Sequence, residues 1–415
     1  MVYRNILCLA ADGLRPDFLG AYGNSLYATP ALDRLASEGC VFDFAFCRHP
    51  SPEGFYLSAW SGESTDRPLD EADSPGSLLR IADECGYLTV LITDDRRTAE
   101  LPSAAAFAEA ILVENPPATD PVDAVDETAV VRLLATAAEW VAQQAGQGVR
   151  QTEGHDAKPW LLWVHIGAIT RSWDAPIGPG SESAQPDQKP SSSTDVPMRR
   201  LDAATGEIGP EELTFWRDRY ADQVEALDCG IELFVESLAA MQQLDDTLLI
   251  LAGCRGFPLG EHGRLGLVDQ SLFEELVHIP FMIRAPDGFG RAQRTSHLVA
   301  DIDLAATVAE ACGLDDGRDA FGDGRSLIPL LRGDAAELRD ALFFQSSDGD
   351  RAVRTADWYL RLPRSSTANP STFDAQPELY SKPDDRWDAN EISGLCADVV
   401  AELVELQRSR TEEQN

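Results

Sequence analysis

Three carboxylates stand directly after apolar runs that are typical of buried strands. Asp12 follows the first such run, and Asp94 and Asp95 follow a later one. Carboxylates gathered at one place can hold a divalent metal ion. They are also common as solvated strand ends and helix caps, above all in an acidic chain. Both interpretations stay open at this level.

Two arginines occupy similar positions after other apolar runs. Arg171 and Arg255 would bring two guanidinium groups to the same edge of a sheet. Such a pair can hold a sulfate or carboxylate group through paired hydrogen bonds. The ordinary alternative is a surface or ion-paired arginine, with Asp94 or Asp95 as an internal partner.

Other candidates have common structural roles as alternatives. Glu261 and His262, in a Gly-Glu-His-Gly turn, could join a rebuilt metal site, although His262 is also suited to ordering the loop. His165 ends an apolar run, which favours a hydrogen-bonded core histidine over a catalyst.

The apolar runs alternate with helical patterns. Alternation of this kind predicts an α/β fold, a mostly parallel sheet with helices on both faces. In such sheets ligands bind beyond the carboxyl ends of the strands, where these candidates would converge. The expected strands are Asn5 to Ala11, Leu88 to Thr93, Trp160 to Ile166, Thr247 to Ala252 and Pro280 to Ile283. The expected helices are Thr29 to Gly39, Ser77 to Cys85, Asp126 to Gln144 and Phe215 to Met241.

The pattern becomes less periodic toward the end of the chain. We predict an α/β domain over residues 1–335 and a small C-terminal α+β subdomain over 336–415, with a helix at Ala397 to Gln407. Residues 178–209, rich in Ser, Pro, Asp and Gly, are expected to form a flexible surface excursion.

The formal net charge is -36. A surface of this sign repels nucleic acid and anionic lipid, so neither is an expected partner. It also disfavours long polyanions such as sulfated polysaccharides. A small anionic ligand in a local basic pocket, or a protein partner, remains compatible with this charge.

Eight scattered cysteines form no CxxC pair, a pattern that favours reduced thiols. The first residues read as a strand and not as a signal peptide, and no apolar stretch approaches the length of a membrane span. These features predict a cytoplasmic location.

Several motifs, taken in order, resemble the sulfatases of the alkaline phosphatase superfamily. Each motif alone is weak, but their order and spacing make the resemblance specific. They are Asn5 to Gly23, Thr29 to Gly39, Gly86 to Thr89, Tyr220 to Asp228, Leu244 to Leu251, Gly260 to Gly263, Ile279 to Pro286, His297 to Ile302 and Gly324 to Gly333.

The resemblance implies a chemistry as well as a fold. In this family a formylglycine made from Cys or Ser, in a C/S-x-P-S-R context, attacks the sulfur of a sulfate ester. Calcium, held by two Asp after the first strand and by Asp plus Asn or His after a later one, neutralises the oxygens. Lys and His supply further positive charge and a proton for the leaving group.

At the first strand and the nucleophile loop this sequence departs from the family. Asp12 matches the first metal ligand, as a vestige, but the second ligand is replaced by Gly13. Counting without gaps places Pro52 at the nucleophile position, and proline has no nucleophilic atom. The family's P-S-R falls on Gly54 to Tyr56, so the maturation signal is missing too; Ser51 and Cys47 lie nearby but would need a shifted loop.

Departures continue at the other expected site positions. Asp94 stands in the register of an anion-binding Lys, Thr170 in that of a His, and Arg255 among the second pair of metal ligands. The segment Leu267 to Gln270 lacks the expected Lys. Each change removes a charge, an acid or a nucleophile, while the turn glycines and strand runs of the scaffold are kept.

We therefore predict a folded pseudo-sulfatase with a binding or regulatory role and no required cofactor, its calcium site being lost. Arg171 and Arg255 are the ligand-binding candidates, and no catalytic residue is assigned. The alternative is an active sulfate- or phosphate-ester hydrolase with a metal site rebuilt around Asp12, Asp94 and Asp95.

Overall fold

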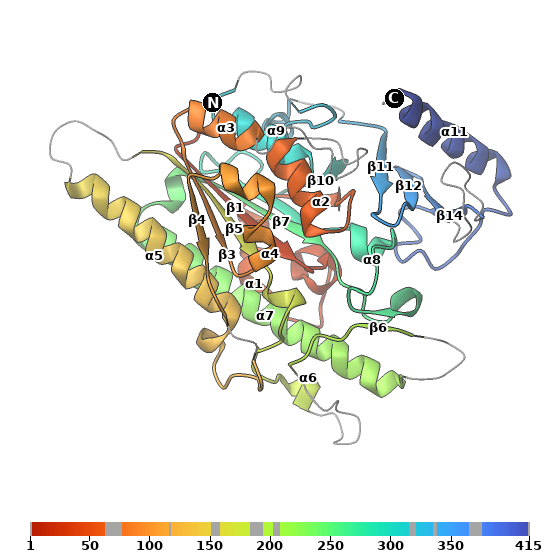
Figure 1. Ribbon diagram of the computed structural model, residues 1–415, viewed down its shortest axis with the longest axis horizontal. Helices are drawn as coiled ribbons and strands as arrows, with labels where there is room; N and C mark the ends of the chain where they lie inside the picture. The colour runs from red at the N-terminus through yellow and green to blue at the C-terminus, as the bar shows by residue number, and fades with distance from the viewer. Residues whose placement is uncertain are drawn as a thin grey trace.

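An eight-stranded sheet forms the centre of the protein (Figure 1). The computed structural model describes residues 2–62, 77–115, 118–150, 158–182, 194–201, 208–314, 321–334, 338–364 and 376–413. The strand order is β10-β2-β9-β7-β1-β5-β3-β4. The strands are β1 (Asn5–Asp12), β2 (Cys40–Phe46), β3 (Leu88–Thr93), β4 (Glu109–Leu112), β5 (Trp160–Ile166), β7 (Thr247–Arg255), β9 (Phe281–Arg284) and β10 (Gln293–Ala300).

Every strand of this sheet is parallel to the others except β9, which runs antiparallel between β7 and β2. Strand β1 is buried along its whole length, which explains its unbroken apolar sequence. Its alternate residues enter two cores, because successive side chains point to opposite faces. The five expected strands are present; β2, β4 and β10 were not predicted.

Helices cover both faces of the sheet (Figure 1). Helices α1, α5 and α7 pack on one face, and α2, α3 and α9 on the other. The predicted α/β fold class is confirmed. The helices are α1 (Pro30–Glu38), α2 (Pro52–Tyr56), α3 (Ser77–Glu84), α4 (Arg96–Ala99), α5 (Ala129–Arg150), α6 (Pro179–Glu182), α7 (Pro210–Ala240), α8 (Glu274–Val277), α9 (Asp303–Ala311), α10 (Ile328–Arg332) and α11 (Ala397–Glu413).

Helix α5 starts three residues later than the sequence pattern suggested. Its first turn is capped from a distance, because the Asp174 carboxylate accepts a hydrogen bond from the Ala129 amide over 2.7 Å. Residues 125–127 form a separate 3-10 turn before it. A cap supplied by a residue 45 positions away leaves no local signal in the sequence.

A second, antiparallel sheet lies beside the edge of the first (Figure 1). It contains β11 (Ala341–Gln345), β12 (Arg351–Thr355), β13 (Trp358–Leu362) and β14 (Glu378–Ser381). One of its faces packs with residues of β2 and β10, and the other packs under α11. The division at residues 335 and 336 stays a prediction, and residues 335–337 and 365–375 lie outside the described chain.

The expected excursion at 178–209 falls partly outside the described residues, at 183–193 and 202–207. Its described part includes β6 (Arg199–Arg200), which pairs with β8 (Arg264–Leu265). Within the described chain, no helix has both the length and the apolar character needed to cross a membrane.

Candidate functional site

The carboxyl ends of the main strands surround one pocket. Asp12 ends β1, Arg255 ends β7, and Thr170 lies in the 3-10 turn after β5. The pocket has a volume of about 530 Å³, and these three residues line it together with Asp95 and Arg171. It lies where a doubly covered parallel sheet places its ligands.

Arg255 grips both oxygens of the Asp12 carboxylate. Its Nε donates to Oδ1 over 2.8 Å and its Nη2 donates to Oδ2 over 3.0 Å. The Thr170 hydroxyl donates to Oδ2 as well, over 3.0 Å. Burial lowers the pKa of Arg255, but the charge of Asp12 and the hydrogen bonds to it raise that pKa by more, so the guanidinium stays charged. Asp12, which matches the first metal ligand of the sulfatases, is therefore bound by a guanidinium group.

Gly13 has a backbone conformation that excludes a restored carboxylate. Its φ is +85°, and a Cβ built there would lie 2.5 Å from Cγ2 of Thr170. Real Cβ atoms do not approach so closely, so Thr170 and any side chain at position 13 compete for the same space.

Gly13→Ala is expected to lower the free energy of unfolding by about 1–3 kcal/mol, because it adds a strained φ to the contact with Thr170. Urea denaturation measures the loss. In a Thr170→Ser background, which keeps the hydroxyl and removes Cγ2, the same substitution should cost less. Equal costs in the two backgrounds would show that the contact with Thr170 contributes nothing.

Pro52 is the first residue of helix α2 and stands at the position that the resemblance to sulfatases assigns to the nucleophile. The neighbouring Ser51 is the N-cap of this helix, since its Oγ accepts the Gly54 amide over 3.0 Å. His49 Nδ1 lies 3.2 Å from the same oxygen, and burial lowers the pKa of His49 to about 4. The Ser51 hydroxyl thus has a structural role at the rim of the pocket.

Asp94 and Asp95 each bind nearby backbone. Asp94 Oδ1 accepts the Gly167 amide over 2.7 Å, and burial raises the pKa of Asp94 to about 6. Asp95 is the N-cap of α4, accepting the Thr98 amide over 3.1 Å. Arg171 donates to the Asp94 carbonyl and lies 3.4 Å from Asp95 Oδ1. Arg171 is the more exposed of the two candidate arginines: 45% of its side chain is accessible, against 15% for Arg255.

A buried cluster that the sequence did not reveal lies beneath the ion pair. Tyr56 OH lies 2.5 Å from His165 Nδ1 and 3.7 Å from Cys254 Sγ. Burial lowers the pKa of His165 to about 4 and raises the pKa of the Tyr56 hydroxyl and the Cys254 thiol. All three are neutral at pH 7, and the cluster fits the core role expected for this histidine.

Glu261 and His262 point to partners outside the pocket. Glu261 pairs with Arg15 over 3.1 Å. His262 stacks on Phe273 with ring centroids 3.6 Å apart, and its Nδ1 lies 2.9 Å from Glu275 Oε1. Neither lines the pocket at the strand ends.

The sequence model of the family described as Sulfatase matches residues 4–314. The chain belongs to the sulfatase family. Its curated relatives in this family match over shorter segments. One is the extracellular sulfatase SULF-1 homolog of Drosophila melanogaster, 30% identical over 118 residues, which are 28% of this chain and 10% of the relative. Another is the N-acetylglucosamine-6-O-sulfatase of Bacteroides thetaiotaomicron, 26% identical over 147 residues, 34% of this chain and 26% of the relative. The chain therefore covers about a quarter or less of either relative.

Solved structures of sulfatase-like proteins match along almost the full length. A protein solved with its substrate D-glucosamine-2-N,6-O-disulfate has a TM-score of 0.75 at 18% identity, covering 100% of this chain and 99% of the other. The phosphonate monoester hydrolase of Agrobacterium radiobacter has a TM-score of 0.73 at 18% identity, with 99% and 95% covered. At this level of identity the likeness establishes the shared fold.

The calcium site expected for the sulfatase family does not fit the residues of this member. Calcium needs six to eight oxygen ligands, several of them anionic. Of the two carboxylates expected after the first strand, this chain keeps Asp12, and both of its oxygens bind Arg255. Gly13 has no room for a side chain. Positive charge from Arg255 would also repel a divalent ion placed beside Asp12.

Proposed function

We propose that this member of the sulfatase family is catalytically inactive and binds a small anionic ligand in the pocket at the strand ends. Arg171 and Arg255 would supply the donors. In this role Arg255 stands in for the metal as a fixed positive charge, and the bound group is not hydrolysed.

The bidentate pair of Arg255 with Asp12 is the observation that carries this proposal. A guanidinium in the metal position presents a fixed positive group to a ligand, although Asp12 balances its charge, and it cannot lower the pKa of a bound nucleophile as a metal does. Pro52, at the aligned nucleophile position, offers no atom for attack. Together these residues support ligand binding and oppose turnover.

An active hydrolase with a rebuilt metal site is the alternative. It would need several of the carboxylates at the strand ends to point to one place. Asp94 and Asp95 accept hydrogen bonds from backbone amides, and Glu261 forms an ion pair with Arg15. Within the described residues, no three His, Cys, Asp or Glu side chains are grouped so that they could hold a metal ion. These contacts favour the inactive form.

Metal content and turnover test the two functions directly. The purified full chain is incubated with Ca²⁺, Mn²⁺ or Zn²⁺, freed of unbound metal and analysed for bound ion, and then assayed with 4-nitrophenyl sulfate and 4-nitrophenyl phosphate. We expect far less than one metal per chain and no turnover above a protein-free blank. One bound metal per chain together with turnover abolished by Asp12→Ala would overturn the proposal.

A thermal-shift titration with inorganic sulfate and phosphate tests the binding role in the same preparation. Arg171→Gln should weaken any stabilisation, because it removes a charged donor from the pocket wall without touching the Arg255 pair. Stabilisation equal in wild type and Arg171→Gln would argue against this pocket as the binding site.

The predicted location and partners follow from composition. All eight cysteines lie in the described chain and are free thiols, which supports a reducing compartment such as the cytoplasm. The net charge of -36 supports the prediction that nucleic acid and anionic membranes are not partners. A protein partner that binds differently to the ligand-bound and ligand-free forms would fit a regulatory role.

A further inference from the structure

A second cavity lies between the main sheet and the C-terminal sheet. Its volume is about 290 Å³. Asp43 of β2, Glu274 and His278 at helix α8, Arg354 of β12 and Arg386 after β14 line it. It shares no lining residue with the pocket at the strand ends.

Arg354 is a buried charge that forms no ion pair with any described residue. Only 1% of the residue is exposed. Its Nη1 donates to backbone carbonyl oxygens of the following turn, at 3.2 Å for Ala356 and 3.4 Å for Trp358. Its Nε has no hydrogen-bond partner among the described residues. Carbonyls orient a guanidinium but bring no negative charge, so the cost of burying this cation is only partly offset.

The other buried arginines of the described chain each have a carboxylate partner. The pairs are Arg15 with Asp17, Arg48 with Asp301, Arg219 with Asp222 and Arg361 with Glu378. Arg354 is the exception in a strongly acidic protein, where carboxylates are plentiful. The lack of a direct ion pair at Arg354, among the described residues, is therefore a specific feature of this cavity.

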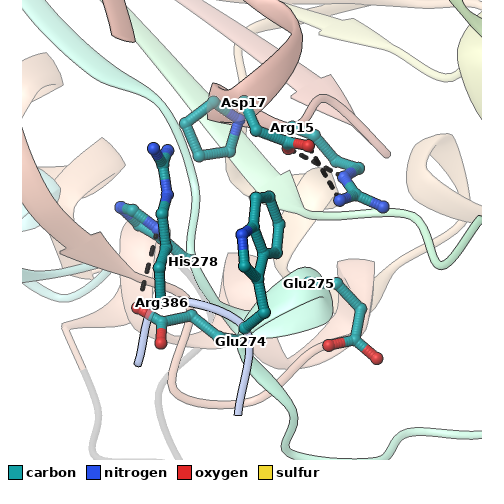
Figure 2. Close-up of a pocket in the computed structure, with 8 residues that line it drawn as sticks. Arg15, Asp17, Glu274, Glu275, His278 and Arg386 are labelled. Carbon is teal, nitrogen blue, oxygen red and sulfur yellow. Dashed lines mark hydrogen bonds and ion pairs between the residues drawn. The ribbon is translucent and has the colours of Figure 1, made fainter. Parts of the chain in front are cut away.

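Arg386 adds a second cation to the same wall. In Figure 2 it stands beside His278 in the adjoining small pocket, which shares Glu274, His278 and Arg386 with the cavity. Its guanidinium carbon lies 5.4 Å from the centre of the Trp387 ring. Within the described chain it forms no ion pair.

The acids that face the cavity already have cations of their own. Glu274 pairs with buried Lys382, which also holds Asp388 over 2.7 Å. Asp43 pairs with Arg294.

His278 and more distant acids complete the charges near the arginines. His278 Nε2 donates to the Asp43 carbonyl over 2.8 Å, and burial lowers the pKa of His278 to about 3, so the ring is neutral. The charge of Glu274 acts most strongly on Arg354, followed by those of Asp388 and the exposed Asp357, but none of these acids forms an ion pair with it. Within the described chain the two arginines thus form no ion pair, although the charge of Glu274 acts on both.

We propose that this cavity binds a small oxyanion, the carboxylate, phosphate or sulfate group of a metabolite, between Arg354 and Arg386. A planar guanidinium fork matches such a group with two parallel hydrogen bonds. Arg354 is rigidly placed by its carbonyl contacts and by the rings of Phe44 and Phe46, whose centres lie 5.7 and 5.8 Å from its Cζ. Arg386, half-buried and joined to the protein by fewer contacts, would close on the anion from the solvent side.

Fluorescence of Trp387 tests the site, because an anion that draws Arg386 away changes the charge beside this ring. The full chain is titrated with sodium phosphate, sulfate and acetate at constant ionic strength set by sodium chloride, and Trp387→Phe assigns the signal. We expect saturable binding of at least one of these anions. Arg386→Gln should raise the dissociation constant about tenfold, the loss of one charge-assisted hydrogen bond.

Arg171→Gln is the matched control, since Arg171 lines the other pocket. Titration curves equal to wild type in Arg171→Gln and weakened in Arg386→Gln support the second site. The reverse pattern would assign the anion to the pocket at the strand ends and overturn this inference while leaving the proposed function intact. A linear, unsaturated response to all three anions, equal to that of chloride, would also overturn it.

Discussion

Replacing Arg255 with methionine is expected to lower the free energy of unfolding by about 3–5 kcal/mol, because it leaves the buried Asp12 carboxylate without its cationic partner. Asp12 has 5% of its side chain exposed, and among the described residues Thr170 would be its remaining side-chain partner. Without the guanidinium the carboxylate must either stay charged without compensation or take up a proton. Urea denaturation followed by circular dichroism measures the loss.

Two controls separate the charge from the packing. The double variant Asp12→Asn with Arg255→Met removes both charges and should recover most of the loss. Arg97→Met changes an exposed arginine of the same pocket wall that pairs with no carboxylate among the described residues, so it should stay within about 0.5 kcal/mol of wild type. If Arg255→Met alone left the denaturation midpoint unchanged, the pair would not be a structural lock on the pocket.

The α/β architecture was predictable because it depends on patterns that are local in the sequence. Buried parallel strands such as β1 and β5 must be apolar on both faces, and that gives long apolar runs. Strand β10 escaped prediction because its first half is exposed and polar. The start of α5 was misplaced because its cap comes from Asp174, and no local rule contains such a contact.

The candidate site was predictable in position and less so in its contacts. Their positions after the predicted strands indicated that Asp12, Arg171 and Arg255 would lie close together. Which carboxylate each arginine binds depends on distances of an ångström or two between segments far apart in sequence. Arg255 reaches Asp12, 243 positions away, and Arg171 reaches Asp95.

The partner groups beneath and beside the site carried no sequence signal. Cys254 and Tyr56 look like core residues, and only the folded chain brings both to His165. Arg354 lies in an ordinary strand pattern, and the absence of an ion pair with any described carboxylate becomes apparent only when the acids around it are placed. Ion pairs between segments far apart in the sequence belong to the tertiary structure alone.

Replacing Lys382 with methionine is expected to cost at least as much as the Arg255 change at pH 8, about 3–5 kcal/mol of unfolding free energy. The side chain is fully buried, and its ammonium serves two buried carboxylates, Glu274 and Asp388. These contacts tie the loop after β14 to helix α8. Removing the cation would leave two negative charges facing each other in a place with little water, so the docking of the C-terminal sheet should weaken as well.

The pH dependence identifies this loss as electrostatic. Burial raises the pKa of Glu274 and raises that of Asp388 to about 7, while the charge of Lys382 opposes both shifts. A carboxyl with a raised pKa holds a proton in the folded state that the unfolded chain releases between about pH 4 and pH 7, so its contribution to stability falls as pH rises through that window. Without Lys382 both carboxyls should protonate more readily, and the deficit relative to wild type should shrink from pH 8 to pH 5. Adding Asp388→Asn to the variant, at a left-handed position that asparagine tolerates, should recover part of the loss at pH 8. A deficit of the same size at pH 5 and pH 8 would instead mean that the lysine stabilises the protein through its packing and not through its charge.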